Sequence, residues 1–87
     1  MAEYRLLINA SAAKEIEAVG AKSERLRVVQ RIQALAKTPR PQGSEKLAGH
    51  SDRYRVRQGR YRIIYLIDDG RCEVTIFKVG HRKDVYR

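Results

Sequence analysis

The 87-residue sequence has little of the material from which several classes of protein are built. One cysteine, Cys72, cannot form a disulfide within the chain, and the two histidines, His50 and His81, lack the Cys/His spacing of a zinc site. No apolar run approaches the roughly 20 residues of a membrane span. An apolar signal core and a glycine-rich phosphate-binding loop are also missing. We therefore expect a cytoplasmic protein without metal, cofactor or membrane association.

Positive charge is what the sequence has in excess. Nineteen Lys and Arg residues stand against ten Asp and Glu residues, which gives a formal net charge of +9 and a pI near 10.2. Such a balance favours a polyanionic partner such as nucleic acid, a ribosome, an acidic protein or an anionic membrane. The plainer interpretation is that the charge only keeps a small protein soluble. The length predicts a single domain over residues 1–87.

The first half of the chain has the pattern of one strand and two helices. Residues 3–9 alternate as a strand does, Ser11 is a candidate N-cap for a short helix, and Ser23 is a candidate N-cap for a longer one. Pro39 and Pro41 cannot continue a helix and end the second one. The apolar stripe predicted on the second helix consists of Leu26, Val29, Ile32 and Leu35/Ala36.

From Glu45 onward the apolar period changes from helical to alternating. Residues 53–57 and 60–67 predict a hairpin that turns at Gln58-Gly59, and the second of these strands, apolar on both faces after Arg62, reads as central in a sheet. A third strand follows the turn at residues 68–70, with Cys72 expected as a small buried side chain. The order β-α-α-β-β-β predicts an α+β fold in which two N-terminal helices pack on an antiparallel sheet.

Four arginines cluster in this predicted hairpin. Alternation puts Arg53, Arg55 and Arg57 on one side of their strand, and Arg62 is expected opposite Arg55 or Arg57. Like charges that face each other reduce stability unless an anion bridges them. Because guanidinium groups bind phosphate oxygens in pairs and stay charged, and no acid lies within this stretch of sequence, the cluster predicts a phosphate site. A solvated strand face is the alternative for any single arginine.

The tail "GHRKDVYR" brings a second set of polar groups to the end of the third strand. His81, Arg82 and Tyr86 offer acid–base, charge-stabilising and stacking chemistry. Together with the arginines they suit metal-free cleavage of RNA, whose own 2′-hydroxyl attacks the neighbouring phosphate. The protein then has to orient the backbone and stabilise the charge of the phosphorane.

The stretches "KLAGHSDRYRVRQGRYRIIYLI" and "KVGHRKDVYR", on the predicted order of elements, resemble the RelE branch of the RelE/ParE toxin superfamily. The resemblance covers essentially the whole chain. It implies a RelE-like fold and a ribosome-dependent endoribonuclease that cuts messenger RNA in the ribosomal A site and inhibits translation. It also implies an acidic, RelB-like antitoxin, with oligomers formed only together with that antitoxin.

The family's functional positions fall on named residues of this chain. Basic residues of the second strand correspond to Arg55 and Arg57, the phosphate-stabilising arginine to Arg62, and the later arginine and C-terminal tyrosine to Arg82 and Tyr86. His81 stands where some relatives have an acid–base histidine. Basic residues expected to contact RNA or the ribosome as flanking charge are Arg53, Arg60, Lys46 and Lys83.

This chain departs from the best-studied RelE pattern, which has lysines at the positions of Arg55 and Arg57. A crowded lysine can lose its proton and act as a base, whereas arginine effectively cannot. We therefore hypothesise that the arginines act electrostatically and that His81 or Tyr86 transfers protons.

Three other functions remain compatible with the sequence. A ParE-like toxin would use the same scaffold against DNA gyrase, without nuclease residues. A non-catalytic module would bind RNA or the ribosome through the arginine-rich hairpin. A degenerate, inactive toxin would be retained for its antitoxin complex.

Overall fold

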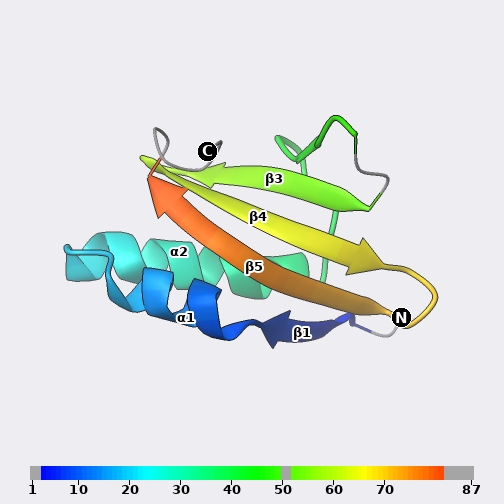
Figure 1. The fold of residues 1–87 in the computed structure, drawn as a ribbon, viewed down its shortest axis with the longest axis horizontal. Coiled ribbons are helices and arrows are strands. Elements are labelled where there is room, and N and C mark those ends of the chain that lie inside the picture. Colours follow the sequence, from blue (N-terminus) through cyan, green and yellow to red (C-terminus); the bar gives the residue numbers. More distant parts are fainter. Residues whose placement is uncertain (1–2, 50–51, 82–87) are drawn as a thin grey trace.

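Two helices cover one face of a mostly antiparallel sheet in the computed structural model, which describes residues 3–49 and 52–81 (Figure 1). The strands are β1 (Arg5–Ile8), β2 (Glu45–Lys46), β3 (Arg53–Gln58), β4 (Tyr61–Asp68) and β5 (Glu73–His81), and the helices are α1 (Ala10–Glu17) and α2 (Lys22–Leu35). Within these residues the strands lie in the order β1-β5-β4-β3-β2. The predicted α+β fold is confirmed, with one short strand, β2, added to the predicted order.

The two helices begin at different residues from those predicted. Asn9, and not Ser11, is the N-cap of α1, because its side-chain oxygen accepts a hydrogen bond from the Ala12 backbone N–H at 2.8 Å. Helix α2 starts one residue before Ser23, after Ala21, and has no side-chain cap. The two serines are therefore weak guides to the helix starts: Asn9, two residues before Ser11, caps α1, and α2 has no side-chain cap.

The core lies between the helices and the sheet. Helix α2 contributes Val28, Ile32 and Leu35, all at most 1% exposed, whereas Leu26 of the predicted stripe is 52% exposed. Ile32 and Leu35 are buried as predicted, but the buried stripe begins at Val28 and does not include Leu26. From the sheet, the core includes Val56, Ile63, Tyr65, Ile67, Val74, Ile76 and Val79.

Strand β4 is central, as predicted, between β3 and β5. Its residues Ile63 and Tyr65 are fully buried against the helices, and Ile64, between them, is 4% exposed. Strand β1 joins the sheet at its edge as a parallel partner of β5, with Leu6 opposite Val74. No helix covers the second face of the sheet in the described part of the chain, and we call this face the open face (Figure 1).

The turns differ from prediction by small shifts. Gln58 pairs with Tyr61, so the β3–β4 turn is Gly59-Arg60 and not Gln58-Gly59. Gly59 has φ +60°, which glycine adopts without strain. Cys72 was expected to be buried in a strand, but it is exposed in the β4–β5 turn with φ +53°. Neither described helix is long and apolar enough to cross a membrane.

Candidate functional site

The arginines of β3 project onto the open face of the sheet. Val56 is fully buried in the core and Tyr54 packs against it, so the helix-facing side of β3 is defined. Because neighbouring strand residues point to opposite faces, Arg53, Arg55 and Arg57 lie on the other side, as the alternation predicted. The open face therefore carries a row of guanidinium groups from β3, which we call the arginine row.

Arg57 and Arg62 are direct cross-strand partners. The register of β3 and β4 places Arg57 opposite Arg62, which resolves the two registers that the sequence left open. Cross-strand partners have Cα atoms roughly 4.5–5.5 Å apart, so the two cations start from neighbouring positions on one face. Arg57 is exposed, and no carboxylate of the described residues forms an ion pair with it. Arg62 is half-buried, beside Gly80 of β5.

An acid reaches the arginine row from β2. Glu45 is the cross-strand partner of Arg55 and forms an ion pair with its guanidinium, whose side chain is only 11% exposed. The expectation that no acid lies nearby holds for the sequence stretch but not for the fold. A two-residue strand leaves no periodic signal, so β2 and its carboxylate could not be found by pattern.

Arg53 contacts an aromatic ring two strands away. Its Cζ lies 4.9 Å from the ring centroid of Phe77 in β5, and the side chain thus crosses β4. Arg60 is exposed in the β3–β4 turn. Lys46 is exposed in β2, where it pairs with Tyr54. The three described basic residues that were assigned to flanking contacts, Arg53, Arg60 and Lys46, are therefore not equivalent, since Arg53 already contacts Phe77.

His81 is directed differently from the arginine pair. It is the last residue of β5, and its ring meets Tyr61 edge-on at a centroid distance of 6.0 Å. Tyr61 packs against the helix-side core, and His81 helps to line a cleft of about 280 Å³ beside Glu15 and Val19. The structure thus brings His81 to the same end of the sheet as Arg62 but sets its ring among helix-side residues.

Glu15 of α1 holds the strand that leads to His81. Its Oε1 accepts a hydrogen bond from the Val79 backbone N–H at 2.8 Å, and its Oε2 lies 3.8 Å from Lys78 Nζ. Strand β1 pairs with β5 only as far as Ile76, and the β4–β5 register shifts at Ile64/Tyr65. The carboxylate therefore satisfies a backbone donor beyond the end of β1. No sequence pattern indicates this role of Glu15.

The remaining predicted site residues lie outside the described ranges. These are Arg82, Lys83 and Tyr86 of the tail, and the same holds for His50. Their proposed roles stay predictions from the sequence and the resemblance.

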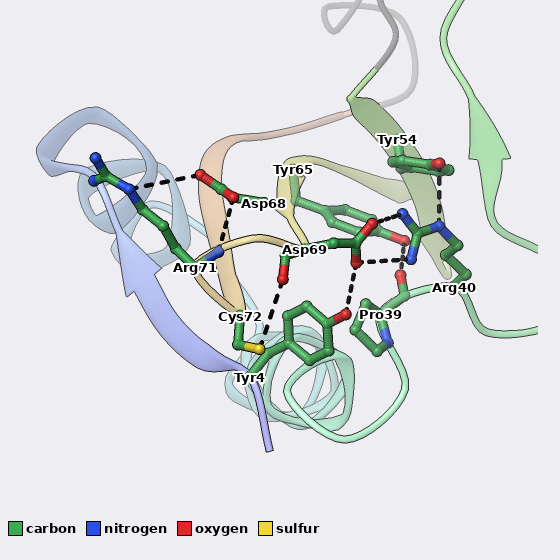
Figure 2. Close-up of polar contacts among 9 residues, drawn as sticks. All are labelled: Tyr4, Pro39, Arg40, Tyr54, Tyr65, Asp68, Asp69, Arg71 and Cys72. Carbon is green, nitrogen blue, oxygen red and sulfur yellow. Dashed lines mark hydrogen bonds and ion pairs between the residues drawn. The ribbon is translucent and has the colours of Figure 1, made fainter. Parts of the chain in front are cut away.

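A polar cluster at the β4–β5 turn, at the end of the sheet away from Arg57 and Arg62, holds the start of β3 in place (Figure 2). Arg40 donates to Asp69 Oδ2 at 2.8 Å and to the Tyr54 hydroxyl at 3.1 Å, and Tyr4 donates its hydroxyl to Asp69 Oδ1 at 2.6 Å. The hydrogen bonds from Arg40 and Tyr4 hold the pKa of Asp69 below its ordinary value. Because Tyr54 lies between Arg53 and Arg55, this cluster anchors the strand that carries the arginines.

Tyr65 connects the same region to the segment after α2. Its ring is fully buried, stacks near Tyr54 at a centroid distance of 6.0 Å, and its hydroxyl donates to the Pro39 carbonyl at 2.7 Å (Figure 2). Burial raises the pKa of Tyr65 to about 12. This tyrosine is therefore a structural residue of the core.

Among residues 3–49 and 52–81, no three His, Cys, Asp or Glu side chains gather closely enough to hold a metal ion. The chemistry that the described surface offers is that of guanidinium groups around an aromatic and aliphatic strip. Such a surface can bind phosphate oxygens through paired N–H donors and can stack against planar groups.

Comparisons with known proteins agree with this arrangement. A family described as ParE toxin of the type II toxin–antitoxin system, parDE, matches residues 6–86. Toxin RelG of Mycobacterium tuberculosis is 47% identical over 34 residues, and the match spans 39% of this chain and 39% of that protein.

Two solved structures share the fold over nearly the whole chain. The archaeal RelE–RelB complex from Pyrococcus horikoshii superposes with a TM-score of 0.82 at 27% identity, over 95% of this chain and 99% of that one. The toxin–antitoxin complex RelBE2 from Mycobacterium tuberculosis gives 0.80 at 26% identity, over 97% of each chain. With the family matched over residues 6–86 and the fold shared, this chain belongs to the RelE/ParE superfamily of type II toxin–antitoxin toxins.

Proposed function

We propose that this toxin is a ribosome-dependent endoribonuclease that cuts messenger RNA in the ribosomal A site and so stops translation. The observation that carries the proposal is the direct pairing of Arg57 with Arg62 on the open face. Two like charges at this spacing reduce the stability of a sheet, and an anion that bridges them removes the cost. A phosphodiester has two oxygens with which to do so.

The proposed reaction uses the substrate's own nucleophile. The 2′-hydroxyl loses its proton and its oxygen forms a bond to the adjacent phosphorus, while the bond from phosphorus to the 5′-oxygen breaks. The products are a 2′,3′-cyclic phosphate and a 5′-hydroxyl that gains a proton. Charge accumulates on the phosphorane oxygens, where fixed guanidinium groups stabilise it most.

Residue roles follow from this chemistry. Arg55, Arg57, Arg62 and Arg82 are assigned to electrostatic stabilisation, because arginine does not release its proton at relevant pH. His81 and Tyr86 are the candidates for proton transfer. The edge contact of His81 with Tyr61, among helix-side residues, favours Tyr86 for this role.

We also propose an acidic, RelB-like antitoxin as the cognate partner. The net charge of +9 and the arginine row complement an acidic chain. The structural neighbours from Pyrococcus horikoshii and Mycobacterium tuberculosis are complexes of toxin with antitoxin. Co-expression with the product of the adjacent reading frame should restore growth and yield a complex. If that product neither binds nor rescues, the partner assignment fails.

Mapping the ends of messenger RNA after induction in cells tests the nuclease. Wild-type protein should produce cuts in phase with codons, and Arg62→Ala should abolish them. Arg71→Ala is the matched control, because it removes the same charge from an exposed side chain in the β4–β5 turn and should cut normally. Intact messages after wild-type induction, with translation unaffected, would contradict the proposal.

Inhibition of DNA gyrase is the second candidate, since the matched family is described as ParE toxin. Growth arrest with intact messages and a DNA-damage response would favour it. Ribosome binding without cleavage would instead indicate a non-catalytic module, and full growth would indicate an inactive copy.

A further inference from the structure

The open face carries apolar side chains that the nuclease mechanism leaves without a role. Ile64 and Leu66 of β4 lie opposite Arg55 and Arg53, and Phe77 of β5 lies beneath the Arg53 guanidinium. Leu66 and Phe77 are only half-buried. No helix covers this face within the described residues, so an aromatic ring and a guanidinium form a layered, partly exposed surface there.

The Arg53–Phe77 contact has the chemistry of a stacking site. A guanidinium 4.9 Å from a ring centroid is within cation–π range. Nucleic-acid bases stack on aromatic rings and on the planar guanidinium of arginine, largely without regard to base identity. A purely structural role, in which Arg53 only shields Phe77 from water, predicts the same contact but no effect on a bound base.

The arginines beside the Arg53–Phe77 contact indicate which kind of ligand this surface binds. Arg55 and Arg57 continue the same face of β3, and Arg62 stands across from Arg57. A ligand that stacks a flat ring on the Arg53–Phe77 layer and places a phosphate between Arg57 and Arg62 combines both features, and single-stranded RNA does so. The distance from Arg53 to Arg57 along the strand is about 13 Å, at roughly 3.3 Å per residue. The stacked base therefore belongs to a nucleotide near the cut phosphate, and the Arg53–Phe77 layer does not itself contact that phosphate.

We propose that Arg53 and Phe77 form a stacking platform for one base of single-stranded RNA, beside the Arg57–Arg62 phosphate site. The proposal rests on the nuclease function above and adds how the strand is aligned along the sheet. Within it, Phe77 supplies the ring and Arg53 supplies a planar cation that spans β4.

The test uses short single-stranded RNA oligonucleotides with 2-aminopurine at successive positions, a probe whose fluorescence falls when it stacks. Phe77→Leu removes the ring but keeps an apolar side chain of similar size, and Arg53→Lys keeps the charge but removes the planar group. Arg71→Lys in the β4–β5 turn is the matched control. Thermal unfolding of each variant shows that it folds.

The wild type and Arg71→Lys should quench 2-aminopurine at one position. Phe77→Leu should lose this quenching and bind about tenfold more weakly. Arg53→Lys should lose most of the quenching while the dependence of binding on salt stays the same, because the charge remains. The two variants are independent, so a folding defect in one leaves the other decisive.

Other outcomes overturn the platform. Equal quenching in wild type, Phe77→Leu and Arg53→Lys would do so, and so would a wild type that quenches no position. An acidic peptide whose binding depends on Phe77, when RNA quenching does not, would assign the surface to a protein partner. Cleavage on ribosomes is measured separately: loss of cutting and weaker RNA binding in Arg62→Ala, with the same quenching at saturating protein, supports both ideas. Quenching without any wild-type cleavage would retain the platform and remove the nuclease.

Discussion

Glu45 and Arg55 are joined twice, as cross-strand partners of β2 and β3 and as an ion pair on the open face. The Glu45 carboxylate thus binds the Arg55 guanidinium, which the proposed mechanism assigns to the RNA phosphate. Because the Arg55 side chain is only 11% exposed whereas that of Glu45 is 64% exposed, the acid is the more accessible partner. Binding of RNA therefore has to compete with Glu45.

Glu45→Gln should tighten binding of single-stranded RNA. Neutralising Glu45 removes one anion that competes with RNA phosphate for Arg55, so affinity should rise severalfold and the slope of log affinity against log salt should steepen by about 0.7. Fluorescence anisotropy over a salt series measures both quantities. Glu17→Gln, an exposed acid on α1, changes the net charge equally and is the control. Equal shifts in the two variants would show a general charge effect and contradict the prediction.

Arg57→Gln should separate stability from function. It relieves the repulsion with Arg62, so the free energy of unfolding should rise by about 0.5 kcal/mol at low salt. The gain should shrink in high salt, where exposed charges are screened. Cleavage on ribosomes should fall at the same time. Urea unfolding at two salt concentrations checks the first effect, with Arg71→Gln as control. A loss of stability in Arg57→Gln would mean that the opposed pair does not repel.

Tyr65→Phe should weaken the connection between β4 and the segment after α2. The variant loses the hydrogen bond to the Pro39 carbonyl, which should lower the free energy of unfolding by about 1 kcal/mol at neutral pH. RNA binding should be unaffected, because Tyr65 lies beneath the helix-covered face.

The alkaline range gives a second measure of Tyr65. Its pKa is about 12 in the folded chain, against an ordinary value of 10.0, so the unfolded chain loses the proton first. This contribution to stability is complete below pH 10 and is lost as pH rises to 12. The free energy of unfolding, measured between pH 10 and pH 12, should fall more steeply with pH for wild type than for Tyr65→Phe. Parallel curves would contradict the assignment.

The sequence predicted those parts of the fold that repeat a period. The alternation of β3 and the double-sided apolar pattern of β4 extend over several residues, and the two prolines after α2 rule out a longer helix, so each gives a clear signal. Single contacts between distant segments do not. Glu45 reaches Arg55 from a two-residue strand, and Glu15 accepts an N–H from Val79, 64 residues later.

Some features of the candidate site follow from sequence patterns, and others depend on contacts between distant segments. The arginine row and its face follow from alternation, but whether Arg62 opposes Arg55 or Arg57 depends on the turn, and a one-residue shift decides it. Likewise, Phe77 reads in the sequence as one apolar residue in a strand. Only the register of three strands brings it under Arg53.

The assignment of proton transfer is tested by His81→Ala and Tyr86→Phe. The His81 ring contacts Tyr61 and lines the cleft beside Glu15, away from the face that carries Arg57 and Arg62. We therefore expect His81→Ala to retain cleavage on ribosomes within about tenfold, and Tyr86→Phe to lose about 100-fold or more, as removal of a general acid or base does. The pH–rate profile of cleavage should change in Tyr86→Phe only.

The reverse pattern would assign proton transfer to His81 and would require its ring to leave Tyr61 when RNA binds. Tyr61→Leu distinguishes that case, because loss of the edge contact should then raise the activity of the otherwise wild-type protein. If both His81→Ala and Tyr86→Phe leave the pH–rate profile unchanged, neither side chain transfers the proton. The arginines and the ribosome would then carry the chemistry without them.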